Sequence, residues 1–147
     1  MNAFLNDLIS KDGKLYLKSS NTLFEGNIVG KLNVKVLSGM LDGLCKSFYD
    51  SGELKEEYSY KLSNIEGEFI SYYKNNKKNW VGSYLNNKKN GFWLQYTDNS
   101  EIKRKANFLH DLANGEWFTY HKNGNIESKL IYKSGVLEGK FCAYYDN

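Results

Sequence analysis

Histidine and cysteine are the residue types that most often bind metal ions, and this chain has two of each. His110 and His121 have no further ligand at the short spacing that a zinc site requires, so we expect no metal site and no cofactor. Cys45 and Cys142 lie on strands that the repeat described below separates by roughly 38 Å, whereas the Cα atoms of a disulfide lie within ~7 Å. Both are predicted to be free thiols, as is usual in a reducing cytoplasm.

The sequence also lacks the spacing of a nucleotide site or a catalytic site. A phosphate-binding loop has the pattern Gly-x-x-x-x-Gly-Lys-Ser/Thr, and the nearest segment, Gly26-Asn-Ile-Val-Gly-Lys31, is spaced differently. No Gly-x-Ser-x-Gly nucleophile elbow occurs, and the carboxylates are scattered over turns and outward strand positions. We therefore predict a protein that is not an enzyme.

Lysine supplies almost all of the positive charge of the chain. Twenty basic and 17 acidic residues give a net charge of +3, and Arg104 is the one arginine. Proteins that read bases or clamp phosphates usually depend on the forked arginine side chain, which weighs against nucleic-acid binding. Residues 43–66 carry more acids than lysines, whereas residues 67–90 carry five lysines against Glu68: Lys74, Lys77, Lys78, Lys88 and Lys89. This density either steers an acidic partner protein or merely keeps the surface soluble.

These residues take their places from a repeat of 24 residues. The spacing is set by five glycines in strict register, Gly43, Gly67, Gly91, Gly115 and Gly139. Two residues after each glycine stand Cys45, Phe69, Trp93, Trp117 and Phe141, and aromatic columns recur five and 17 residues after it. Self-similarity at a fixed period indicates a repeat architecture. A shortened unit starts at Gly26, so the array is predicted over residues 26–147, with residues 1–25 forming an N-terminal cap and a lead-in strand.

Each unit is predicted to be a β-hairpin. Turn-forming residues, such as Asn99 in one unit and Gly124 in another, separate two runs of residues. The second run alternates with period two, which is typical of a strand: Leu54, Tyr58 and Tyr60 share one face, and charged residues fill the other. Hairpins in series predict an all-β fold, an elongated single-layer antiparallel meander of ~24-residue hairpin repeats. Most aromatic residues then serve to cover the sheet.

Trp80 departs from its column. Thirteen residues after the glycine the chain has Glu56, Trp80, Arg104 and Ser128. Tryptophan is enriched among the residues that dominate protein interfaces, so Trp80 is predicted to anchor a partner. The alternative is that its ring covers Gly82, the position in the same strand that lacks a side chain. The predicted partner-binding residues are Trp80, Lys77, Lys78, Lys88, Lys89, Tyr84 and Phe92.

The repeating unit Gly-x-Trp/Phe-x-x-Tyr-x-x-Asn-Gly, followed by a tyrosine and the next glycine, resembles the MORN repeat, in particular its bacterial variant. The segment Lys11-Asp-Gly-Lys-Leu-Tyr-Leu-Lys18, with Leu23-Phe-Glu-Gly26 after it, is similar to the opening of YwqK-type antitoxin proteins. The resemblance implies a β-meander without enzymatic activity that binds other proteins, among them toxins. Two units depart from the pattern, because Asn76 and Ser100 replace glycine in their hairpin turns.

The function predicted from these observations is that of a cytoplasmic antitoxin or immunity protein that binds and masks a toxin, nuclease or other effector protein. One alternative is attachment to an anionic membrane surface through lysine and aromatic side chains. Another is a nucleic-acid-binding module in which rings stack on bases and lysines contact phosphates. Strand edges at the ends of the array also allow an edge-to-edge homodimer.

Overall fold

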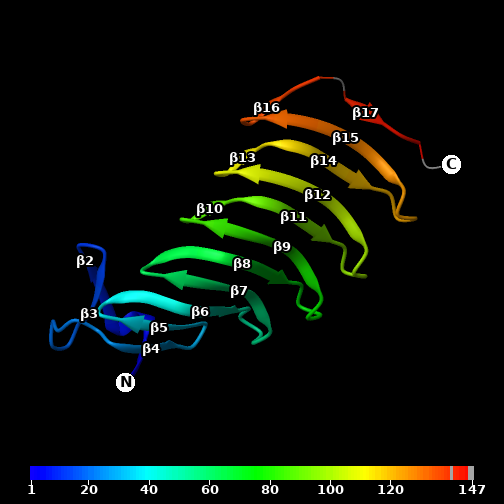
Figure 1. Cartoon of the computed structure of the whole chain (residues 1–147). Coiled ribbons are helices and arrows are strands. Elements are labelled where there is room, and N and C mark those ends of the chain that lie inside the picture. The colour runs from blue at the N-terminus through cyan, green and yellow to red at the C-terminus, as the bar shows by residue number, and fades with distance from the viewer. Residues whose placement is uncertain (140, 146–147) are drawn as a thin grey trace.

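The computed structural model describes residues 1–139 and 141–145, which form β-strands joined by short turns. Figure 1 shows the strands stacked in one row of bowed ribbons, with one hairpin following another from the N-terminal to the C-terminal end. The predicted single-layer antiparallel meander is confirmed. Lys140, Asp146 and Asn147, which the predicted array includes, lie outside the described residues.

The N-terminal segment folds against the first strands of the row. Its elements are β1 (Asn2–Phe4), the 3-10 helix η1 (Leu5–Asp7), β2 (Leu8–Lys11) and β3 (Lys14–Leu17). β1 joins the main sheet as the parallel neighbour of β4, which departs from the antiparallel pattern. The stretch expected to hold a lead-in strand contains β3, which pairs with β2 in a separate hairpin. This hairpin touches the row where the Leu15 amide donates to the Gly39 carbonyl.

The tightest hydrophobic core lies beneath this N-terminal segment. Phe24, Val36 and Cys45 have no exposed surface, and Leu8 from β2 packs into the same cluster. Here the sheet has a second layer over one face, so aliphatic side chains are buried in the ordinary way. Further along the row the sheet has to be covered by its own side chains, which explains why the aromatic residues are concentrated there.

The row continues through fourteen strands, some of them very short. They are β4 (Gly26–Val29), β5 (Leu32–Leu37), β6 (Met40–Phe48), β7 (Leu54–Lys61), β8 (Asn64–Tyr72), β9 (Lys78–Leu85), β10 (Lys88–Lys89), β11 (Gly91–Tyr96), β12 (Ile102–Leu109), β13 (Leu112–Ala113), β14 (Gly115–Tyr120), β15 (Ile126–Lys133), β16 (Val136–Leu137) and β17 (Cys142–Ala143). β10, β13 and β16 are two-residue strands, and each pairs with the end of the long strand that precedes it.

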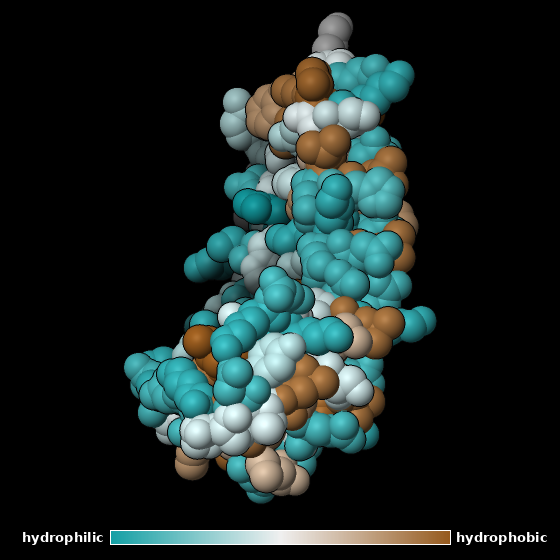
Figure 2. Space-filling model, turned by 90° about the vertical axis from the view of Figure 1, so that its left-hand side faces the viewer, coloured by the Kyte–Doolittle hydropathy of each residue, from teal (hydrophilic) through white to brown (hydrophobic). Residues whose placement is uncertain are grey.

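Two kinds of turn alternate along the row. At one end of each hairpin the turn has positive φ nine residues after the repeat glycine, at Gly52, Asn76, Ser100 and Gly124. At the other end two consecutive residues have positive φ, as at Asn86 and Asn87, which is the backbone of a type I′ turn. Figure 2 views the molecule from the side of these two-residue turns, where hydrophilic side chains dominate and hydrophobic ones form separate patches.

The repeat glycine is required by the backbone conformation, and not by close packing of its neighbours. Gly43 and Gly67 both have φ of +84°, and a Cβ atom added to either would meet nothing within 4 Å. Between the pairs Tyr58–Phe69 and Tyr60–Ile65, one residue of β7 faces three residues of β8, with Gly67 in the middle. The glycine therefore forms a bulge in each unit, which bends the strand and resets its register.

Candidate interaction surface

Strand pleating divides the side chains of the array between two faces. One face, here called the ring face, carries the aromatic columns, namely Tyr60, Phe69, Tyr84, Trp93, Phe108, Trp117 and Tyr132. Its rings touch from unit to unit, with Phe108 and Trp117 centroids 5.1 Å apart and Trp117 and Tyr132 centroids 5.1 Å apart. The other face, here called the opposite face, carries mixed apolar and charged residues, among them Phe92, Lys105, Phe118 and Lys129.

Trp93 is the packing centre of the ring face. Its ring lies 5.2 Å from that of Tyr84 and 5.3 Å from that of Phe69, and the residue is 1% exposed. A Cβ atom added to Gly82 would come within 2.2 Å of Trp93 Cδ2, so this glycine makes room for the indole. The ring that covers Gly82 is therefore Trp93, and the alternative role considered for Trp80 is corrected. Trp80 touches Trp93 edge-on, with centroids 6.3 Å apart, and stays half-buried.

Beside the rings, a continuous line of paired residues crosses the strands. Each member is the register partner of the next, and we call this line the cross-strand row: Ser47, Glu56, Ser71, Trp80, Gln95, Arg104, Thr119 and Ser128. Because neighbouring strands lie ~4.8 Å apart, the row is roughly 34 Å long. Partners on adjacent strands share a face, so the row lies on the same face as Trp93. It is two positions from the ring column in β8, β11 and β14, and four positions from it in β7, β9, β12 and β15.

The cross-strand row presents hydrogen-bonding groups interrupted by Trp80. Ser47 Oγ donates to Glu56 Oε2 at 3.3 Å, and the Thr119 and Ser128 hydroxyls are 2.6 Å apart. Ser71 Oγ accepts from the Trp80 amide at 3.1 Å. Arg104 is half-buried, and its guanidinium has no ion pair or hydrogen bond to any residue in the described ranges. The row therefore contains one aromatic side chain that is only partly packed, Trp80, and one cationic side chain without a partner within the described residues, Arg104.

A first hollow of about 250 Å³ lies at Trp80, and Glu56, Ser71, Tyr84 and Lys89 also line it. Lys89 Nζ lies 4.6 Å from the Trp93 ring centroid and 5.9 Å from that of Trp80. The cation–π contacts hold the ammonium over the rings. Within the described residues, Asn79 Oδ1 beside this hollow and Trp93 Nε1 are buried without a hydrogen-bond partner. A hollow with aromatic walls and a few polar groups that lack hydrogen-bond partners is typical of binding sites.

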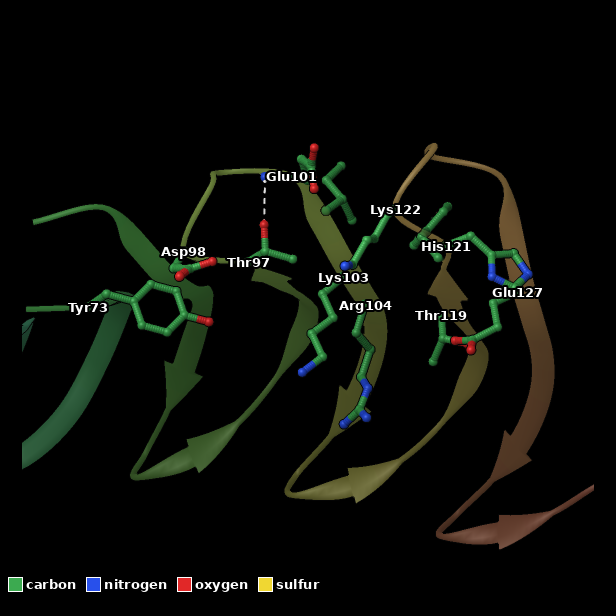
Figure 3. Close-up of a pocket in the computed structure, with 12 residues that line it drawn as sticks. Tyr73, Thr97, Asp98, Glu101, Lys103, Arg104, Thr119, His121, Lys122 and Glu127 are labelled. Carbon is green, nitrogen blue, oxygen red and sulfur yellow. Dashed lines mark hydrogen bonds between the residues drawn. The ribbon is translucent and has the colours of Figure 1, made fainter. Parts of the chain in front are cut away.

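A second and larger hollow, of about 630 Å³, lies at Arg104. Figure 3 shows that its lining comes from three neighbouring hairpins, with Tyr73 from the first, Lys103 and Arg104 from the second and His121 from the third. The charged residues that line it are Asp98, Glu101, Lys103, Arg104, Lys122 and Glu127. Arg104 and Thr119 belong both to this hollow and to the cross-strand row, so the hollow opens onto the row.

The hollow at Arg104 follows from a missing ring. Six residues after the repeat glycine, Tyr49 and Tyr73 donate their hydroxyls to the carbonyls of Tyr72 and Tyr96, at 2.7 and 2.8 Å. His121 Nε2 reaches the Tyr144 carbonyl in the same way, at 2.9 Å. The side chain at this position in the intervening unit is Thr97, which is too short to reach the next hairpin. Its Oγ1 instead accepts from the Glu101 amide at 3.2 Å, as Figure 3 shows.

Burial raises the pKa of two tyrosines near these hollows. Desolvation raises the pKa of the Tyr84 hydroxyl above its usual value, and the charges of Asp111 and Glu56 raise it further. Burial also raises the pKa of Tyr73, with a contribution from the charge of Asp98. Tyrosine is neutral at physiological pH even at its ordinary pKa, and both upward shifts act in the same direction.

The structure brings together only part of the predicted partner-binding set. Trp80, Tyr84 and Lys89 meet at the first hollow. The other members lie elsewhere. Lys77 is exposed in the hairpin turn before β9, Lys78 is exposed at the first position of β9, and Lys88 is exposed beside the two-residue turn after it. Phe92 is 63% exposed on the opposite face, with Lys105 Nζ 5.0 Å from its ring. The set thus spans both faces and both ends of the hairpins.

Arg104 and Thr97 are the residues of the surface that the sequence reasoning missed. Arg104 stands in the same column as Trp80, and its lack of a partner depends on the neighbouring strands, which the sequence pattern does not place. Thr97 carries a signal in the sequence, since it stands in a column with Tyr49, Tyr73 and His121. A small residue in a column of rings indicates a gap between two hairpins.

Other kinds of site receive no support from the described residues. They contain no group of three or more histidine, cysteine, aspartate or glutamate side chains arranged to hold a metal ion. Within the same ranges, no helix has the length and apolar character to cross a membrane. Cys45 and Cys142 are both free, with Cys45 buried and Cys142 exposed, so the predicted absence of a bond between them agrees with the structure.

Comparison with known proteins supports the repeat assignment. Residues 41–62 and 113–134 match the family model described as a MORN repeat variant. The two matched segments lie 72 residues apart, which is three periods of the 24-residue register. Each covers one hairpin, with β6 and β7 around the turn at Gly52 in the first and β14 and β15 around the turn at Gly124 in the second. No curated protein matches the chain. The matches support a MORN-repeat protein.

Proposed function

We propose that this chain is a scaffold that binds another protein along its ring face, with Trp80 as the principal anchor. Repeats of the MORN type generally bind proteins or membranes. The observation that carries the proposal is the cross-strand row, in which an aromatic and a cationic side chain stand open beside two hollows. A sheet that needed its side chains only for packing would bury or pair them, as it does with Trp93.

The geometry suits a protein ligand because the row is long and chemically varied. A row of roughly 34 Å offers hydroxyls, an amide, a carboxylate and a guanidinium in one line. A partner segment lying across the strands meets a new pair of these groups every ~10 Å, which is the width of one hairpin. Such a surface suits an extended polypeptide, whose successive side chains can each contact one part of the row, better than a single small molecule.

The more specific form of the proposal is an inhibitor that masks a toxin or effector protein in the bacterial cytoplasm. The resemblance of residues 11–26 to the opening of YwqK-type antitoxin proteins supports it. So does the excess of lysine in residues 67–90, which suits a partner with an acidic surface. The free thiols of Cys45 and Cys142 are compatible with a reducing compartment.

Site-specific photocrosslinking tests the ring-face proposal. A photoreactive phenylalanine analogue replaces Trp80 in one variant and Phe92 in a matched variant, and both are expressed in the cells of origin. We expect mass spectrometry to find a polypeptide crosslinked at the Trp80 position and absent from the Phe92 position. Equal crosslinking at Phe92, or no crosslinked polypeptide at Trp80, contradicts the proposal.

Growth rescue tests the inhibitor form. The crosslinked polypeptide is expressed alone and together with the chain in the same cells. We expect growth arrest in the first case and recovery in the second, with less recovery when Trp80→Ala replaces the wild type. A partner that leaves growth unchanged when expressed alone rules out the toxin and leaves the scaffold proposal standing.

A second candidate, attachment to a membrane surface, has one observation in its favour. On the opposite face, Lys105 Nζ lies 5.0 Å from the Phe92 ring and Lys129 Nζ lies 5.4 Å from the Phe118 ring. Lysine beside an aromatic ring suits an anionic lipid interface. Lys129 is also paired with Glu116, which reduces the positive charge of this face. Flotation with vesicles containing 30% phosphatidylserine should fail for the wild type if the ring-face proposal is right.

A further inference from the structure

We propose that the hollow at Arg104, which Thr97 also lines, is a specificity pocket. It takes an acidic side chain of the bound protein and pairs its carboxylate with Arg104. This inference rests on the proposed protein-binding function and names the partner chemistry at one position of the cross-strand row.

The pocket exists because one inter-hairpin contact is absent. Tyr49, Tyr73 and His121 each bridge to the carbonyl of the residue 23 positions further on. By the same register, a tyrosine at position 97 would reach the Tyr120 carbonyl. Thr97 and Tyr120 both line the hollow, so the missing ring accounts for the open space between the two hairpins. This one unit therefore lacks the bridge that the units on either side of it carry.

Arg104 decides which charge the pocket accepts. Of the six charged residues that line it, Arg104 is the one that is not exposed. Its guanidinium has no hydrogen bond or ion pair within the described part of the chain, so its donors remain unused. A half-buried guanidinium gains more from a carboxylate than an exposed ammonium does, because bidentate hydrogen bonds form with less screening by water.

The remaining charges of the pocket are weaker determinants. Two lysines and three carboxylates line it, all of them exposed. Charges in that position are screened by water and contribute little to the choice of ligand. The ligand reaches the pocket along the cross-strand row, since Arg104 and Thr119 belong to both. A polypeptide lying on the row near Trp80 is therefore placed to insert one side chain beside Arg104.

Four variants separate this pocket from its surroundings. Thr97→Tyr installs the side chain that two other units carry and fills the gap, while Thr97→Ser keeps the gap open. Arg104→Glu reverses the charge of the pocket. Lys105→Glu is its matched control, because Lys105 is the next residue of β12 and its side chain lies on the opposite face, over Phe92.

The experiment is a selection from a phage-displayed library of random seven-residue peptides against the purified full chain. The peptides are fused to the phage through their C-terminus, so that every ligand carboxylate comes from an aspartate or glutamate side chain. We expect the wild type, Thr97→Ser and Lys105→Glu to enrich peptides that share one acidic position. Arg104→Glu should enrich lysine or arginine at that position, and Thr97→Tyr should lower the affinity of a selected synthetic peptide at least tenfold.

Thermal unfolding of each variant accompanies the selection, and we expect Thr97→Tyr to melt no lower than the wild type. The proposal is overturned if the wild type selects no acidic position or no peptide at all, or if Arg104→Glu keeps the acidic preference. Unchanged affinity in a folded Thr97→Tyr variant overturns it as well. If the selected peptides show no acidic preference but Trp80→Ala abolishes their binding, the pocket proposal is wrong and the ring-face proposal is retained. If neither Trp80→Ala nor Arg104→Glu changes the selected peptides, both fail.

Discussion

Trp80 and Trp93 show how one residue type serves two purposes in this chain. Trp93 is 1% exposed and touches rings from three strands, so its indole holds neighbouring hairpins together. Trp80 reaches only the edge of Trp93 and leaves part of its surface to a hollow. The sequence predicted the first role from the repeat column and the second from the departure from a column. It did not show which ring would cover Gly82, because that depends on the neighbouring strand.

Gly82→Ala should destabilise the protein. The added methyl group meets Trp93 Cδ2 at 2.2 Å and Cε2 at 2.4 Å, in a residue packed on several sides. Overpacking of this kind costs ~1–3 kcal/mol, and the stiffer unfolded chain returns only ~0.4–1 kcal/mol. The free energy of unfolding from urea titration measures the difference. Val81→Ala, on the neighbouring half-buried position, is the control and should cost about 1 kcal/mol or less. A stabilised Gly82→Ala variant contradicts the packing described for Trp93.

The two cysteines should differ in reactivity. Cys45 is fully buried, and desolvation raises the pKa of its thiol, with the Tyr58 hydrogen bond opposing and the charge of Glu56 adding to the rise. The thiolate is the reactive form, so burial and the raised pKa both slow modification. At pH 8 an aromatic disulfide reagent should modify one thiol per chain quickly, with the second modified only after urea is added. Cys142→Ser should abolish the fast phase. Two fast phases, or none without a reductant, contradict the placement of these residues.

Side chains that the hydrophobic pattern does not reveal tie neighbouring hairpins together, except at Thr97. Tyr73 crosses to the Tyr96 carbonyl, which lies 23 residues further along the chain. The turns behave similarly. Asn76 and Gly124 mark their turns plainly in the sequence, whereas Leu62 and Ser63 take positive φ although leucine disfavours it. The surrounding register imposes that conformation, so the sequence predicts the number of hairpins better than the bounds of each strand.

Tyr73→Phe removes this tie and leaves the ring in place. The bond is half-buried, and the loss of one such hydrogen bond costs ~0.5–1.5 kcal/mol, with the Tyr96 carbonyl left to water. Urea unfolding should show this loss with an unchanged slope. Tyr96→Phe is the matched control, because it keeps the acceptor carbonyl and should cost less than Tyr73→Phe. Equal losses in the two variants contradict the role assigned to the Tyr73 hydroxyl.

The whole molecule is an open row whose length grows with each unit. The sequence predicted this from the glycine register, since hairpins that contact only their neighbours form a linear array. It did not predict the second layer over the first strands, where Phe24 and Val36 are buried beneath the β2–β3 hairpin. Residues 1–25 carry no repeat, and their pairing depends on contacts far apart in sequence. The cross-strand row likewise depends on register across seven pairings rather than on any one motif.

Spin labels placed at matching turns measure this length. The turn residues Asp50, Asp98 and Lys122 are exposed and stand in one column of the repeat. In a chain with Cys142→Ser, labels at 50 and 98 should lie roughly 19 Å apart between Cα atoms, and labels at 50 and 122 roughly 29 Å apart, because each unit adds two strand steps. Pulsed electron resonance reads these distances. A second distance equal to or shorter than the first contradicts an open row.

The claim on which the functional account rests is that partners bind on the ring face. Isothermal titration calorimetry of the crosslinked partner against Trp80→Ala and Phe92→Ala tests it most directly, since these aromatic side chains lie on different faces. We expect Trp80→Ala to weaken binding at least tenfold, about 1.4 kcal/mol, and Phe92→Ala to change it less than twofold. A larger loss for Phe92→Ala, or equal losses for both variants, contradicts the assignment of the ring face.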